Sequence, residues 1–239
     1  MRPASPVENA TSVILFRPVK DGSFEVVLGR PAPGEGAIGG AYTFPRRVIT
    51  KEDFAEGTLR RSWGVSRDEA QKILGAELRP ALALGHWVAG VRALFEGLGF
   101  FLCVTESGNP SPWEERRANL LARREELVRG EISFRSMLET EGLFCDLSPL
   151  RYFSHWLETM DTSTPAHVRY FLARLPPHQD LLEVVRSFGD CRWISPDRAL
   201  AEHQRSGLPL TFSAFASLRA LADFDSWQSL CAEYGVNLT

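Results

Sequence analysis

Glu96 is the residue in the middle of the chain whose type and setting could do metal or acid–base chemistry. It lies in the stretch from Arg92 to Phe100, and Arg92 precedes it by four positions. Carboxylate oxygens are the ligands that Mg²⁺ prefers, but one carboxylate rarely holds this ion without help. Residues four positions apart lie on the same face of a helix, so Arg92 and Glu96 could equally form an ion pair. The spacing alone leaves both roles open.

The stretch from Arg92 to Phe100 resembles the second half of a Nudix box, R-E-U-x-E-E-x-G-U, in which U is an apolar residue. Ala93 and Gly97 stand where the pattern has glutamates, and the positions that match it are Arg92, Leu94, Glu96, Gly99 and Phe100. In an intact box the three glutamates lie at i, i+3 and i+4, so one helix face presents them together to a divalent cation. This chain therefore resembles a Nudix protein with a degenerate box.

The resemblance implies roles for three of these residues. Glu96 would be the surviving metal ligand and the catalytic carboxylate, whereas Arg92 and Gly99 would have structural roles in the box. The cofactor would be Mg²⁺ or Mn²⁺ if the chain is active, bound weakly because one glutamate of three remains, or there would be no cofactor. The carboxylates that could assist Glu96, although the sequence cannot place them beside it, are those of Glu52, Asp53, Glu56, Glu183 and Asp190.

Other segments resemble parts of the Nudix family, in the family's order, over about residues 10–225. Residues 40–45 resemble the G-x-x-x-F-P segment that enters the box, and residues 193–200 resemble its W-[LIV]-S-P-x-x-A-L signature. The closest subgroup is the long-insertion Nudix proteins that include coenzyme A diphosphatase relatives. The extended coenzyme A signature is not intact in this chain, so the subgroup does not supply the substrate. The segments that resemble the family's strands are residues 10–16, 24–30, 150–156 and 168–174.

The resemblance implies an α/β fold: a Nudix-type α/β/α sandwich around a mixed β-sheet, in one domain over residues 1–239. Helical insertions are expected at about residues 50–85 and 108–145. Local patterns agree with this fold, since Ser66 and Glu69 form a capping box that starts a helix. Pro80 and Gly99 are typical of the residues that begin and stop a helix between them. Residues 210–234 are expected to finish the chain as two helices.

Arg46 and Arg47 replace the two glycines that follow Phe-Pro in the family pattern. A guanidinium group binds phosphate oxygens well, so the pair could form an anion site that needs no metal. The alternative is that both side chains are solvated at a strand end. Together with Arg30, at the end of an expected strand, and Phe44, they are the candidate substrate-binding residues. The glycine-rich loop at residues 31–40 also lies where this family contacts its substrate.

A column of small residues is expected on the helix beside Glu96. Gly90, Ala93 and Gly97 are spaced at i, i+3 and i+7, which places them on one helix face. One interpretation is close packing against a strand or loop. The other is a pocket left open where carboxylates used to be, filled by a ligand or by the two arginines.

Composition limits the classes of function. A formal net charge of −3 argues against a nucleic-acid scaffold, for which a basic surplus is expected. The sequence has no apolar run of about 18 residues and no basic, apolar leader, so neither a membrane span nor a secretory signal is expected. The four cysteines are widely spaced without a C-x-x-C pair, which is typical of buried thiols in a reducing compartment. We therefore expect a cytoplasmic protein whose partner is a small phosphorylated molecule, with a homodimer left open.

Two classes of function follow. The first is a Nudix-family hydrolase that acts on the phosphoric anhydride bond of a nucleoside-diphosphate-linked substrate, such as a coenzyme A-type molecule, with weak or altered activity. The second is a catalytically inactive Nudix domain that binds a phosphorylated ligand or a protein partner. Metal-ion catalysis needs a cation held in place, and the losses at Ala93 and Gly97 count against it. The ancestry implied by the resemblance favours the hydrolase.

Overall fold

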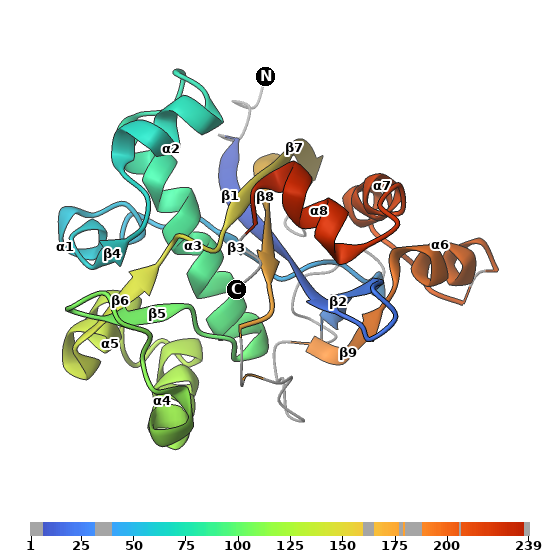
Figure 1. The fold of residues 1–239 in the computed structure, drawn as a ribbon. Coiled ribbons are helices and arrows are strands. Elements are labelled where there is room, and N and C mark those ends of the chain that lie inside the picture. Colours follow the sequence, from blue (N-terminus) through green and yellow to red (C-terminus); the bar gives the residue numbers. More distant parts are fainter. Residues whose placement is uncertain are drawn as a thin grey trace.

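A mixed β-sheet forms the centre of the molecule (Figure 1). The computed structural model describes residues 7–31, 40–159, 165–176, 179, 188–205 and 207–236. The sheet has the strand order β7-β8-β1-β2-β9, and β3 pairs with β1. The β1–β8 pair is parallel and the other pairs are antiparallel. The bounds are Glu8–Pro18 for β1, Phe24–Pro31 for β2, Arg46–Val48 for β3, Arg151–Thr159 for β7, Pro165–Arg174 for β8 and Phe188–Ile194 for β9.

Both faces of this sheet are covered by helices. Successive side chains of a strand point to opposite faces, and β1 follows this rule with Val13 packing on one side and Ile14 on the other. The Val13 side is covered by α3 (Pro80–Leu98). The Ile14 side is covered by three later helices, which lie together in Figure 1: α6 (Pro196–Gln204), α7 (Phe212–Leu221) and α8 (Trp227–Tyr234). The expected α/β/α sandwich around a mixed sheet is confirmed.

The helix that carries Arg92 and Glu96, α3, has the bounds expected from the sequence. Pro80 occupies its first turn, and Gly99 ends it with a left-handed φ of 78°, a conformation that glycine adopts without strain. Every residue from Ala83 to Leu98 is buried. The reason is that α3 lies between the sheet and the segments inserted before and after it. We call α3 the box helix below.

The inserted segments contain short helices and a small second sheet. Before the box helix lie α1 (Glu56–Leu59) and α2 (Arg67–Leu74), and the capping box of Ser66 and Glu69 is present at the start of α2. After it lie α4 (Trp113–Val128) and α5 (Phe134–Glu141), within the expected helical segment 108–145. The second sheet was not predicted from the sequence. It has the strand order β4-β6-β5, with β4 at Ser62–Trp63, β5 at Cys103–Thr105 and β6 at Leu143–Asp146. Strands of two to four residues are too short to show an alternating pattern.

Candidate functional site

An ion pair connects β3 to the box helix. Arg47 lies opposite Thr11 in the β1–β3 pair, and the Thr11 hydroxyl lies 2.9 Å from Nδ1 of His86 on the box helix. Directly opposite residues share a face of the sheet, so Arg47 also faces the box helix. Its Nε donates to Oε2 of Glu96 at 2.5 Å. The structure thus brings one of the two predicted arginines to Glu96.

Arg92 holds the same glutamate and a buried aspartate. Its Nε and Nη2 donate to the two carboxylate oxygens of Asp53 at 2.8 Å each, and Nη2 also donates to the Val48 carbonyl at 2.9 Å. Its Nη1 lies 3.2 and 3.4 Å from the two oxygens of Glu96. Burial alone would lower the pKa of Arg92, but the hydrogen bonds and charge of Asp53, with the charge of Glu96, raise that pKa above its ordinary value. Arg92 is therefore a permanent cation that fixes the loop of residues 48–53 to the box helix.

These contacts leave Glu96 poorly suited to hold a divalent cation. Arg92 lies near both of its oxygens, and Arg47 donates to Oε2. Across the described parts of the chain, no group of three or more His, Cys, Asp or Glu side chains is arranged to hold a metal ion. Mg²⁺ requires near-octahedral oxygen coordination, usually from one or two carboxylates together with water and substrate phosphates. The residues present at the box helix do not fit the Mg²⁺ or Mn²⁺ site that the sequence pattern suggests.

The carboxylates that could have assisted Glu96 are engaged elsewhere. Asp53 is separated from Glu96 by Arg92, which binds both. Glu56 forms ion pairs with Arg60 and Arg67 on the surface, and Asp190 forms an ion pair with Arg192. Glu52 accepts a hydrogen bond from the backbone N–H of Arg135. Glu183 lies outside the described residues.

Arg46 and Phe44 lie on the other side of the sheet. Arg46 is opposite Ser12 in the β1–β3 pair, so its side chain leaves the strand on the face away from the box helix. Its Nη1 lies 3.5 Å from Glu158, a carboxylate that also accepts a hydrogen bond from the Tyr170 hydroxyl at 2.7 Å. Phe44 is 0% exposed and makes an edge-on contact with the Tyr170 ring. The structure does not bring either residue to Glu96.

Arg30 belongs to a third group, around Tyr42. The guanidinium groups of Arg30 and Arg192 lie over the Tyr42 ring, with 5.2 and 5.0 Å to its centroid. The Tyr42 hydroxyl donates to Asp190 and accepts a hydrogen bond from Arg192 at 2.8 Å. Burial and the hydrogen bond to Asp190 raise the pKa of Tyr42. Most of the neighbouring glycine-rich loop, residues 32–39, lies outside the described residues.

The column of small residues is explained at Gly90 by close packing. A Cβ atom on Gly90 would come within 3.0 Å of Leu150 Cδ1 and 3.4 Å of Val13 Cγ2. Ala93 is 0% exposed, and Gly97 is also buried. The structure therefore favours the packing interpretation at Gly90 over a pocket left by lost carboxylates.

Arg124 of α4 is a buried residue that the sequence analysis missed. Its Nε donates to the Phe95 carbonyl at 2.8 Å and its Nη2 to the Glu96 carbonyl at 2.6 Å. The last carbonyls of a helix lack partners within the helix, and a cation is favourable at this end. Arg124 thus fixes the C-terminal turn of the box helix to the insertion. Its sequence signal is weak, since it lies among many charged residues of α4; its i+4 spacing from buried Leu120 is the pattern that could have indicated it.

Buried hydrogen bonds connect Thr11, His86 and Arg169 beside Arg47, which lies opposite Thr11. His86 Nε2 lies 3.3 Å from Arg169 Nη1, and a guanidinium group can only donate. Nε2 is therefore the acceptor, and Nδ1 carries the proton and donates to Thr11. Burial, followed by the charges of Arg169 and His155, holds the pKa of His86 well below its ordinary value. His86 is thus neutral and holds the Thr11 hydroxyl by a hydrogen bond.

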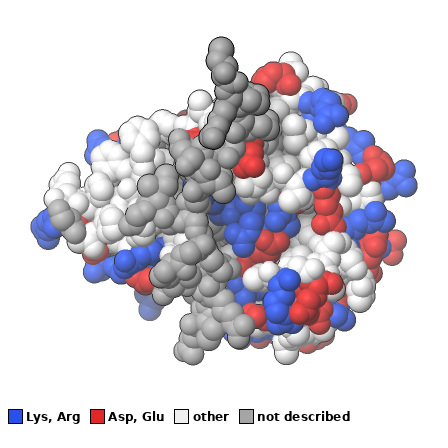
Figure 2. All heavy atoms as spheres, turned by 180° about the vertical axis from the view of Figure 1, so that it is seen from behind, with Lys and Arg blue, Asp and Glu red and all other residues white. Residues whose placement is uncertain are grey.

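On the face shown in Figure 2, basic and acidic side chains lie next to one another. No helix among the described residues is long and apolar enough to cross a membrane.

Comparison with known proteins identifies the fold. No protein-family model matches the chain, and no curated protein sequence matches it. The structure of a Nudix hydrolase from Alicyclobacillus acidocaldarius is similar over 98% of this chain and 99% of that one, with 18% identity and a TM-score of 0.72. Weaker similarity is found to the Nudix domain of Shewanella oneidensis NrtR complexed with ADP ribose, with 11% identity, a TM-score of 0.43, and 92% and 88% of the two chains covered. A C. elegans Ap4A hydrolase has 13% identity and a TM-score of 0.41, with 91% and 100% covered. The chain has the Nudix hydrolase fold.

Proposed function

We propose that this chain is a member of the Nudix family that binds a nucleoside-diphosphate-linked small molecule without a metal ion and hydrolyses it weakly or not at all. The proposal rests on two ion pairs: the guanidinium groups of Arg47 and Arg92 both contact the carboxylate of Glu96. These ion pairs engage the carboxylate oxygens that a metal ion would need as ligands. A coenzyme A-type molecule is one substrate class within this proposal, suggested by the long-insertion resemblance.

Arg47 is better placed than Arg92 to bind a phosphate group. A guanidinium group has five N–H donors. Within the described residues Arg92 uses Nε, Nη1 and Nη2, whereas Arg47 uses Nε for Glu96 and Nη1 for the Arg46 carbonyl. The Arg47 side chain is also more exposed, at 28% against 10% for Arg92. Charge-assisted hydrogen bonds of this kind contribute about 1.5–3 kcal/mol each. Arg47 can therefore add phosphate contacts while it keeps Glu96.

A weak hydrolase is the second candidate. One observation favours it: Glu96 keeps its box position on the helix, and its side chain is 11% exposed. Substrate phosphates that attract Arg47 would leave Glu96 with fewer contacts. This candidate requires that Glu96 contributes to turnover, which distinguishes it from binding alone.

Calorimetric titration in EDTA tests the proposal. The probes are ADP-ribose, a uridine diphosphate sugar and coenzyme A, at low and raised salt. We expect at least one probe to bind without metal, and its affinity to fall as salt screens the charges. Arg47→Gln should weaken that binding at least tenfold, because the loss of one charge-assisted contact is worth about 1.5–3 kcal/mol.

The matched control is Arg60→Gln, since Arg60 is an arginine of an exposed ion pair, with its side chain 76% exposed. It should bind the probe as the wild type does. If none of the three probes binds in EDTA, the ligand proposal fails. If Arg60→Gln weakens binding as much as Arg47→Gln, the phosphate does not lie at Arg47.

A further inference from the structure

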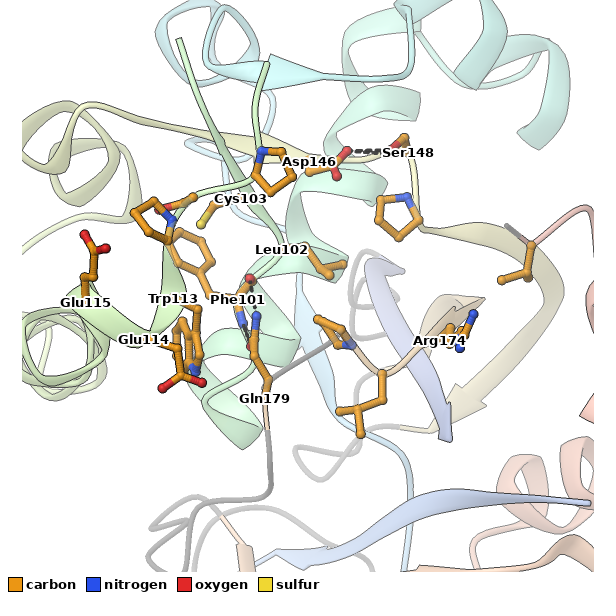
Figure 3. Close-up of a pocket in the computed structure, with 17 residues that line it drawn as sticks. Phe101, Leu102, Cys103, Trp113, Glu114, Glu115, Asp146, Ser148, Arg174 and Gln179 are labelled. Atoms are coloured by element: carbon orange, nitrogen blue, oxygen red, sulfur yellow. Dashed lines mark hydrogen bonds between the residues drawn. The ribbon is translucent and has the colours of Figure 1, made fainter. Parts of the chain in front are cut away.

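A cavity of about 690 Å³ lies between the start of α4 and the ends of β6 and β8. Its wall includes Phe101 and Leu102 after the box helix, Trp113 at the start of α4 and Leu175 after β8 (Figure 3). Small-molecule sites in proteins measure about 300–1,000 Å³ and are lined mainly by apolar and aromatic side chains, with a few polar groups. This cavity has that size and that lining.

The wall of the cavity is held in place without a ligand. The backbone N–H of Phe101 donates to Gln179 Oε1 at 2.9 Å, and Gln179 Nε2 donates back to the Phe101 carbonyl at 3.1 Å. The Phe101 ring packs on Phe95, with 4.4 Å between the ring centroids. Proline fixes its own φ angle, and the lining contains Pro110, Pro112, Pro149 and Pro176. A ligand would therefore enter a preformed site and cause little ordering.

The charged groups of the lining are mainly acidic. Glu114, Glu115 and Asp146 carry three carboxylates, against the one guanidinium group of Arg174. Figure 3 shows Glu114 and Glu115 at the end of the cavity near Trp113, and Arg174 at the opposite end. A like charge brought close to these carboxylates is unfavourable. The cavity thus disfavours a phosphate, and neither Arg47 nor Glu96 belongs to its lining.

We propose that this cavity is a second ligand site, which takes a small uncharged or cationic molecule with an aromatic or alkyl body. The body of the ligand packs against Phe101, Leu102 and Trp113, and a cationic or polar end lies toward Glu114 and Glu115. Burial of apolar surface supplies most of the affinity, and the carboxylates select against anions. The proposal does not depend on the phosphate site at Arg47.

Fluorescence titration with a pair of matched dyes tests the proposal. N-phenyl-1-naphthylamine is uncharged, and 1-anilinonaphthalene-8-sulfonate has a similar body with a negative charge. We expect the uncharged dye to bind one per chain with increased emission, and the sulfonate to bind more weakly. In a Glu114→Gln/Glu115→Gln variant the difference between the two dyes should shrink. The control for charge is Glu139→Gln on α5, which lies outside the lining and should leave that difference unchanged.

Two filling variants locate the dye. Ser111→Phe and Pro110→Trp each place a large side chain in the lining from a different residue, so one remains informative if the other does not fold. Each should weaken binding of the uncharged dye by about tenfold or more, equivalent to about 1.4 kcal/mol. The control is Phe212→Ser, which removes an exposed aromatic ring (74% exposed) outside the cavity and should leave dye binding unchanged.

Three results would overturn the proposal. The first is unchanged dye binding in a folded Ser111→Phe or Pro110→Trp variant, which would place the dye elsewhere. The second is tighter binding of the sulfonate than of the uncharged dye. The third is competitive displacement of the dye by ADP-ribose or coenzyme A, which would make the cavity part of the phosphate-ligand site. Failure of those compounds to bind at all would instead affect the proposed function alone.

Discussion

The Nε–H group of Arg47 on β3 donates a hydrogen bond to Glu96 on the box helix, although the two residues are 49 positions apart in the chain. Arg92 also donates to Glu96, so two guanidinium groups lie against one carboxylate. Two positive charges at this carboxylate oppose the binding of a divalent cation there.

Asp53→Asn should destabilise the protein strongly. Asp53 is 1% exposed and makes both of its carboxylate contacts with the buried Arg92. Without the Asp53 charge, the buried Arg92 is balanced by Glu96 alone, and breaking a buried ion pair by removing one partner costs about 3–5 kcal/mol. Urea unfolding measures this as a lower midpoint. The matched control is Glu56→Gln, in which a surface glutamate loses its pairs with Arg60 and Arg67; its midpoint should stay at the wild-type value. An equal decrease of the urea midpoint in the two variants would show that Asp53 does not stabilise the buried charge of Arg92.

Ala93→Glu, which restores one glutamate of the family pattern, should destabilise the fold and not simply rebuild the box. Ala93 is 0% exposed, so a glutamate there would be buried. A buried polar group without a partner costs about 1–3 kcal/mol in proteins, and a charged one costs more. Thermal unfolding checks this, with the exposed helical position Ala232→Glu on α8 as the control. An Ala93→Glu variant as stable as Ala232→Glu would mean that the helix face at position 93 opens to solvent.

Stability should fall as the pH falls below about 6.5, in part because of His86. The pKa of His86 is held well below its ordinary value in the folded state, mainly by burial. The unfolded chain therefore binds a proton on this histidine at a higher pH than the folded chain does. The contribution is fully present above the unfolded pKa and is lost as pH falls toward the folded pKa. Urea midpoints measured between about pH 7.5 and pH 5 should drop less steeply in His86→Gln than in the wild type. Parallel slopes would contradict the role given to His86.

The sequence predicted the elements whose signals are local. Pro80 and Gly99 marked the ends of the box helix, and Ser66 and Glu69 marked the start of α2, because capping chemistry acts over a few residues. It did not predict that Arg46 and Arg47 point to opposite faces of the sheet, because that depends on the pairing of β3 with β1. It could not assign Arg124 to the end of the box helix, because that contact spans separate elements. The cytoplasmic location and the homodimer remain predictions.

Turnover with and without metal shows whether Glu96 supports catalysis. The measurement is chromatographic detection of products from ADP-ribose, a uridine diphosphate sugar and coenzyme A, with Mg²⁺, with Mn²⁺ and in EDTA. The wild type is compared with Glu96→Gln, which keeps the shape of the side chain and removes its charge. Because Arg47 and Arg92 both form ion pairs with Glu96, we expect the wild type to release no more product than Glu96→Gln under any of these conditions. Brisk Mg²⁺-dependent hydrolysis that is abolished in Glu96→Gln would contradict this expectation. It would show that Glu96 dissociates from Arg47 and Arg92 to support catalysis.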